Sequence, residues 1–156
     1  MTNLSLVAHR IFESHFALVA TPSYLEKRGI PQNLAELNQH DGVIFGKSCT
    51  NAQWELAKTG SLRPVPIRGR LAANHLSAVL EAVREGFGIG LLPLVTVKAP
   101  LEKGLLVEVL PKIRKPSTSV SIVWIGGKFL PPAVRALVDY TKEIFPHMAA
   151  EGDANG

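Results

Sequence analysis

The most glycine-rich stretch of the sequence is Gly86-Phe87-Gly88-Ile89-Gly90, a composition that can hold a phosphate group. A phosphate-binding loop follows a strand and opens a helix, because the amide groups and dipole of that helix then face the anion. Here the glycines follow a helical pattern and precede an apolar strand pattern, and the run lacks the lysine of a P-loop. This order favours a helix end packed against the next strand, with a nucleotide loop as the weaker alternative.

Residue types used in hydrolytic and metal chemistry occur, but not in the patterns that this chemistry needs. None of the histidines has a metal-ligand spacing such as His-x-x-x-His. His40-Asp41 could orient an imidazole, yet no serine or cysteine lies in a nucleophile-elbow context. We interpret that pair as polar loop residues and the single cysteine, Cys49, as an ordinary loop or core residue. The sequence therefore predicts no catalytic residue, no metal site and no cofactor.

One position has a physical reason to bind a ligand. Asn74, His75 and Ser77 lie at the predicted start of the clearest helix. The first amide groups of a helix lack partners within it, and together with the helix dipole they attract an anion. Asn74 is also a good N-cap, so the alternative is that it only closes its own helix. The sequence leaves both interpretations open.

Helical and strand patterns alternate along the 156 residues, which predicts an α/β fold. The clearest helix, 75–85, carries an apolar stripe at helical spacing and ends at Gly86. Thr21 followed by Pro22 predicts one helix start, and Asn33 with Glu36 at capping-box spacing predicts another. Two further helices are predicted over 94–99 and from 131 onward, and strands over 4–8, 16–20, 42–46, 54–57, 62–67, 89–93, 105–110 and 120–125.

Composition narrows the class of protein. Hydrophobic residues make up 46% and charged residues 19%, values typical of a folded globular chain. No apolar run reaches the roughly 18–20 residues that span a bilayer, and the first residues lack the pattern of a signal peptide. We therefore expect a soluble cytoplasmic protein. The net charge of +4 is spread along the chain, which favours a solvated basic surface over a nucleic-acid interface.

Several segments, taken in order, resemble the effector-binding domain of LysR-type transcriptional regulators. The most specific block is Glu81-Ala82-Val83-x-x-Gly86-x-Gly88-Ile89-Gly90-Leu91-Leu92-Pro93. The other matching segments are Leu6-Val7-Ala8-His9-Arg10, Ala17-Leu18-Val19-Ala20-Thr21-Pro22-Ser23-Tyr24-Leu25, Pro31-x-x-Leu34-x-x-Leu37-x-x-His40-Asp41, Trp54-Glu55-Leu56, Pro66-Ile67-Arg68-Gly69-Arg70-Leu71-x-x-Asn74 and Leu130-Pro131-Pro132-x-Val134-Arg135-Ala136-Leu137-Val138-Asp139-Tyr140.

The resemblance implies a fold like type 2 periplasmic-binding proteins, in which two α/β lobes enclose a small-molecule cleft. Residues 1–147 would form part of such a domain, with lobe II complete over about 18–107. Residues 1–17 and 108–147 would supply the C-terminal elements of lobe I, and 148–156 a disordered tail. Family members begin with a winged helix-turn-helix, which this sequence lacks. We also expect the final helix, from 132 to 145, to expose apolar surface that lobe I would cover.

By this resemblance the chain is the effector-sensing and oligomerisation module of a transcription regulator. The implied partners are a small-molecule effector, for which a carboxylate is one candidate class, and a second copy of the chain. Contact with DNA would run only through the missing N-terminal domain, and no membrane contact is implied. The alternatives are a solute-binding protein of related fold, a truncated gene product without function, and a small enzyme.

The resemblance and the helix-start argument together give a set of candidate site residues. The expected ligand-binding residues lie at a strand end and at a helix start, with one further threonine: Ile44, Phe45, Gly46, Asn74, His75 and Thr21. Ala78 and Ala82 lie four residues apart on one side of the 75–85 helix, where small side chains would let a partner helix approach closely. The alternative is that these alanines are only good helix formers.

Overall fold

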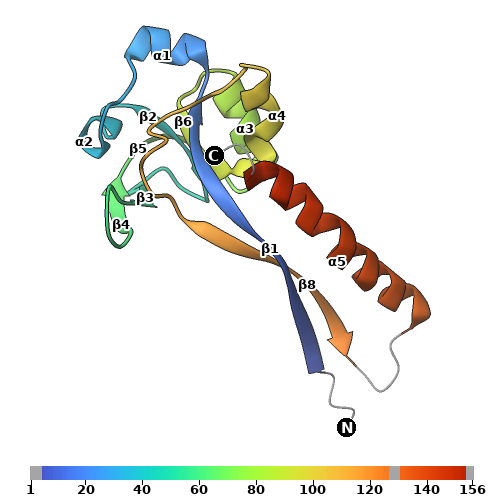
Figure 1. Cartoon of the computed structure of the whole chain (residues 1–156). Helices are drawn as coiled ribbons and strands as arrows, with labels where there is room; N and C mark the ends of the chain where they lie inside the picture. The colour runs from blue at the N-terminus through green and yellow to red at the C-terminus, as the bar shows by residue number, and fades with distance from the viewer. Residues whose placement is uncertain (1–4, 127–130, 154–156) are drawn as a thin grey trace. The chain divides into compact units, whose positions relative to one another are not determined.

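The computed structural model describes the backbone of residues 5–126 and 131–153, and the side chains of residues 6–125 and 131–145. The chain divides into two compact units. The smaller comprises Met1–Ser14 and Ser117–Gly156, and the larger is His15–Pro116. Each is described by itself, with the elements labelled as in Figure 1.

The larger unit is built on a mixed sheet with the strand order β5-β2-β6-β1-β7. Strand β2 runs parallel to both β5 and β6, whereas β1 runs antiparallel to β6 and β7. Parallel neighbours place their C-terminal ends at the same edge of the sheet. The strands are β1 (Ser5–Ala20), β2 (Asp41–Phe45), β5 (Arg68–Ala73), β6 (Ile89–Pro93) and β7 (Val107–Glu108).

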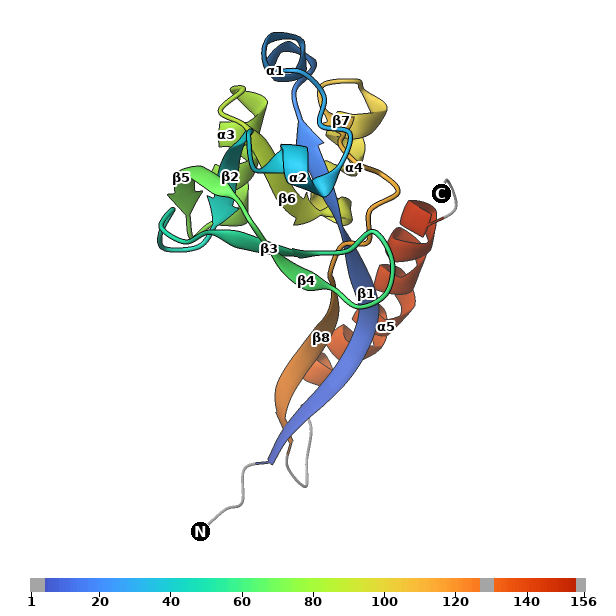
Figure 2. The same cartoon turned by 90° about the vertical axis from the view of Figure 1, so that its left-hand side faces the viewer.

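Apolar side chains cover both faces of this sheet. Along β1, Ala17 and Val19 belong to one buried cluster and Leu18 and Ala20 to the other, because successive strand residues point to opposite faces. The first cluster includes Val79, Val83 and Val97 of helices α3 (Leu76–Arg84) and α4 (Leu94–Glu102). The second lies under α1 (Pro22–Arg28), α2 (Leu34–Leu37) and the hairpin of β3 (Gln53–Leu56) with β4 (Arg63–Pro66). In Figure 2, α2 and this hairpin face the viewer.

The two predicted helix starts are confirmed. Thr21 Oγ1 accepts a hydrogen bond from the Tyr24 amide at 3.2 Å, and Gly29, at φ 83°, follows the last residue of α1. Asn33 Oδ1 accepts from the Glu36 amide at 3.0 Å and caps α2. Each cap acts within four residues, which is why the local sequence reveals it.

Two expectations about strands are corrected. The strands predicted over 4–8 and 16–20 are one continuous strand, β1, within the described residues. The residues between the two predicted strands are extended too, and in the smaller unit β8 (Ser117–Gly126) pairs with β1. The strand predicted over 105–110 shrinks to β7, and Leu110 adopts a left-handed φ of 51°, which ends extended structure.

Two expectations about helix ends are corrected as well. Asn74 does not cap α3: His75 is the N-cap residue, and its side chain makes no capping hydrogen bond. The final helix, α5 (Pro132–Asp153), runs into the segment 148–156 where a disordered tail was expected. The run Met148-Ala149-Ala150-Glu151 consists of good helix formers and favours the longer α5, whereas Pro146 within the helix does not.

The smaller unit combines β8 with residues 5–14 of β1 and helix α5. The rings of Phe12 and Phe145 stack with centroids 6.2 Å apart, which ties the helix to the strand pair. The Ser117 hydroxyl donates to Glu13 across the two strands. The exposed apolar surface expected on the final helix is present at Leu137 and Tyr140, which are 57% and 58% exposed.

Candidate functional site

The C-terminal end of β2 lies beside the start of α3. Phe45 pairs with Ala73 in the parallel ladder of β2 and β5, and the Gly46 amide donates to the Ala73 carbonyl at 2.9 Å. Because Asn74 and His75 follow Ala73 directly, the structure brings Phe45 and Gly46 together with both of them at one edge of the sheet. We call these four residues the strand-end site.

The strand-end site is open to solvent and has unused amide donors. Phe45 is 54% exposed, and Asn74 and His75 are exposed as well. The first backbone bond of α3 runs from the Val79 amide to the His75 carbonyl, so the amides of residues 76–78 precede it without helical partners. With no side-chain cap at His75, this helix start can accept an anionic group from solution.

Two of the predicted ligand-binding residues do not share this surface. Ile44 is 7% exposed and belongs to the buried cluster on the opposite face from α3. Thr21 follows the end of β1, which runs antiparallel to β6, so it lies at the other edge of the sheet from Phe45. Its hydroxyl caps α1, and it is 6% exposed. The inclusion of Thr21 in one concave surface with Phe45 is therefore wrong.

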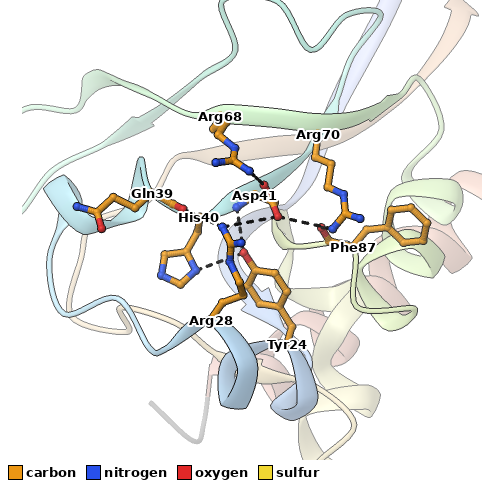
Figure 3. A network of polar contacts seen from close by, with 8 residues as sticks. All are labelled: Tyr24, Arg28, Gln39, His40, Asp41, Arg68, Arg70 and Phe87. Atoms are coloured by element: carbon orange, nitrogen blue, oxygen red, sulfur yellow. Dashed lines mark hydrogen bonds and ion pairs between the residues drawn. The ribbon is translucent and has the colours of Figure 1, made fainter.

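At that other edge, a buried carboxylate lies among three arginines (Figure 3). The Asp41 side chain is 8% exposed. Arg68 Nη2 donates to its Oδ1 at 2.7 Å, while Arg70 Nη1 and Arg28 Nη2 lie 3.6 and 3.9 Å from its Oδ2. We call these four residues the Asp41 cluster. It joins α1, β2 and β5, which are far apart in the sequence.

Tyr24 and His40 form hydrogen bonds next to the Asp41 cluster. Tyr24 Oη accepts from the Asp41 amide at 2.9 Å and lies 3.3 Å from His40 Nδ1. Burial raises the pKa of Tyr24 and lowers the pKa of His40, in each case favouring the neutral form. Both side chains are therefore neutral hydrogen-bonding groups near pH 7, and the geometry shown is that of a structural network.

The sequence pattern does not reveal this cluster. It predicts polar loop residues at His40-Asp41, whereas Asp41 begins β2 and both residues are buried. It predicts a solvated basic surface in general, whereas Arg68 and Arg70, with side chains 61% and 51% exposed, are directed at one carboxylate. Their spacing of two residues within a strand was the available signal, because such residues share a face.

The glycine run forms the predicted helix-to-strand turn. Gly86 follows α3 with φ 76°, and its amide donates to the Val83 carbonyl at 2.9 Å. A Cβ on Gly88 would lie 2.1 Å from the Asp41 carbonyl oxygen, and one on Gly90 would lie 2.6 Å from Val83. Gly88 and Gly90 therefore lack a side chain because β2 and α3 pack closely against this part of the chain.

Comparison with known proteins agrees with this architecture. Residues 2–146 match the family model described as LysR substrate binding domain. The probable HTH-type transcriptional regulator LtrA of Klebsiella pneumoniae is 36% identical over 136 residues, which is 85% of this chain and 44% of that protein. The chain belongs to the LysR substrate-binding domain family.

Solved LysR-type structures show the same fold. The full-length AphB of Vibrio cholerae, described as a virulence activator, superposes with a TM-score of 0.78 at 31% identity, covering 90% of this chain and 48% of that one. The CrgA regulatory domain of Neisseria meningitidis has a TM-score of 0.80 at 23% identity, covering 93% and 71%. The periplasmic-binding-protein-like α/β fold is confirmed, and this LysR domain spans less than half of the curated relatives it matches.

The relatives are named as transcription regulators and not as enzymes. Among the described residues of this LysR domain, no group of three or more His, Cys, Asp or Glu side chains could hold a metal ion. No helix in the described ranges is long and apolar enough to cross a membrane. On α3, Ala78 is exposed and Ala82 is half-buried against the cluster that contains Val79 and Val83.

Proposed function

We propose that this LysR domain senses a small anionic metabolite through the strand-end site. The observation that carries the proposal is the parallel register that sets Phe45 and Gly46 beside the uncapped start of α3. A carboxylate suits this place, because free amides and a helix dipole stabilise an anion while Phe45 offers an apolar contact. The larger unit corresponds to lobe II of the two-lobed fold in this proposal, and the smaller unit supplies elements of lobe I.

The parent protein would be a transcription regulator that acts in the cytoplasm, where its DNA lies. The named functions of LtrA and the other HTH-type relatives support this role, and they disfavour a solute-binding protein or an enzyme. Contact with DNA would be made by a helix-turn-helix outside this chain. Self-association would involve α3, whose exposed Ala78 offers a close approach to a partner.

A thermal-shift screen of small carboxylates tests the proposal. Acetate, succinate and benzoate are added separately to the chain and to His75→Glu, which places a negative charge where the anion would bind. We expect at least one carboxylate to raise the Tm of the wild type and not that of His75→Glu. His9→Glu carries the same change of charge at an exposed position in the smaller unit, and it serves as the matched control. Equal shifts in both variants would contradict the proposal.

A further inference from the structure

A groove separate from the strand-end site lies on the opposite face of the sheet from α3. Its volume is about 640 Å³, within the range of sites that bind small organic molecules. Two segments far apart in the sequence form most of it: residues 30–35, which lead into α2, and residues 108–113, which follow β7. None of the four residues of the strand-end site lines it.

The floor of the groove is apolar and well supported. Pro31 and Leu110 are buried, and Leu34 and Ile113 are half-buried, so they are held by the core beneath. Ile30, at the rim, is 58% exposed and extends the apolar surface of the groove. An apolar ligand of matching length would cover this surface.

A turn with a strained residue shapes one wall. Leu110 has φ 51°, a left-handed backbone conformation that residues other than glycine rarely adopt. The Ile113 amide donates a hydrogen bond to the Leu110 carbonyl at 3.1 Å. Lys115 fixes the same turn by donating to the Pro111 carbonyl at 3.1 Å. Strain of this kind is maintained by the surrounding structure and concentrates at ligand-binding surfaces.

The charges at the rim select the ligand. Lys58 and Lys112 line the groove and are exposed, and no ion pair with a described residue involves either amine. The only acidic residue in the lining is Glu108, whose carboxylate is neutralised by Lys115 at 2.8 Å. The groove therefore presents an apolar floor and a net positive rim.

We propose that this groove binds an amphipathic monocarboxylate, with its hydrocarbon part over Pro31, Leu34 and Leu110 and its carboxylate between Lys58 and Lys112. A second copy of the chain fits less well, because each copy carries a net charge of +4 and the rim is itself basic. The groove and the strand-end site share no residue, so this proposal stands independently of the proposed function.

Octanoate is the probe, and its effect on the backbone amide NMR signals of the chain is the measurement. We expect saturable shifts concentrated at the non-proline residues of 30–35 and 110–113. Octanol, which has the same chain length but no charge, should bind about fivefold more weakly or worse, and added salt should weaken octanoate binding. Ile30→Asp, which places a negative charge on the apolar rim, should also weaken it.

Charge reversal at the rim separates a specific site from general attraction to a basic protein. Lys58→Glu/Lys112→Glu should weaken octanoate binding about tenfold or more. Lys103→Glu/Lys142→Glu makes the same change of net charge at exposed positions outside the groove and should leave the affinity within about twofold. The amide spectrum of each variant reports whether it is folded.

Three results would overturn the proposal. One is the lack of saturable shifts at residues 30–35 and 110–113 with octanoate. Another is equal weakening in the two double variants, or equal binding of octanol. The third is a shift of the same amides when the protein alone is concentrated, which would show that a second copy occupies the groove.

Discussion

Replacing Asp41 by asparagine tests the electrostatic contact that joins α1, β2 and β5. The substitution keeps the size of the side chain and removes its charge. Three guanidinium groups would then face one another without their shared counter-charge, and Arg68 would lose a charged hydrogen bond of 2.7 Å. We expect the free energy of unfolding to fall.

The magnitude follows from the distances and the exposure of the partners. A hydrogen bond to a charged group contributes about 1.5–3 kcal/mol, and breaking a fully buried ion pair costs about 3–5 kcal/mol. The higher range does not apply, because the three arginine side chains are 41–61% exposed and can turn toward water. We expect Asp41→Asn to lower the free energy of unfolding by about 2 kcal/mol, which corresponds to a fall of about 4–8 °C in Tm for a chain of this size.

Urea unfolding followed by circular dichroism measures this loss. Glu102→Gln, at the exposed last residue of α4, makes the same chemical change outside the cluster and is the control. Double-mutant cycles with Arg68→Gln and Arg28→Gln should give a clearly larger coupling for Arg68, since Arg28 lies 3.9 Å from the carboxylate. Two results would contradict this prediction: a loss of unfolding free energy in Asp41→Asn no larger than in Glu102→Gln, or a stronger coupling of Asp41 to Arg28 than to Arg68.

Three further predictions concern other parts of the larger unit. Burial lowers the pKa of His40, so as the pH falls the unfolded state binds a proton at this residue before the folded state does. The free energy of unfolding should therefore fall as the pH drops below about 6.5, and His40→Gln should reduce this pH dependence. Gly88→Ala should lower the free energy of unfolding, measured in urea, by about 2–3 kcal/mol, because its Cβ would meet backbone in addition to the strain of a positive φ. Gly29→Ala shares the strain of a positive φ but would meet nothing within 4 Å, so it should lower that free energy by less; equal effects would contradict the role of close packing at Gly88. In a longer regulator that contains this chain, Ala78→Arg and Ala82→Arg should lower the oligomer mass in analytical ultracentrifugation with an unchanged far-UV spectrum, and an unaltered mass in both would remove α3 from the interface.

Features encoded by neighbouring residues were predictable from the sequence. The caps at Thr21 and Asn33, the glycine turn after α3 and the β3–β4 hairpin each depend on nearby residues, at most 13 positions apart in the hairpin pair Gln53 and Pro66. The strand-end site was predictable in part, because the start of α3 is visible in the pattern and the resemblance supplied the strand beside it. Thr21 was misplaced because the antiparallel direction of β1 is not visible in the pattern.

Contacts between distant segments were not predictable. Asp41 and Arg68 are 27 residues apart, and only the pairing of β2 with β5 brings them together. The groove combines residues around 30 with residues around 110, and its wall depends on the backbone conformation of Leu110. Sequence periodicity assigns each segment a buried face but does not say which other segment covers it.

The position at which a small carboxylate binds is the most direct test of the strand-end site. Amide NMR of the chain, titrated with the carboxylate that raises its Tm most, reports that position residue by residue. We expect the largest saturable shifts at Gly46, His75, Leu76 and Ser77, and we expect His75→Glu to abolish them. Saturable shifts confined to residues away from the end of β2 and the start of α3, or unchanged by His75→Glu, would contradict the proposed site.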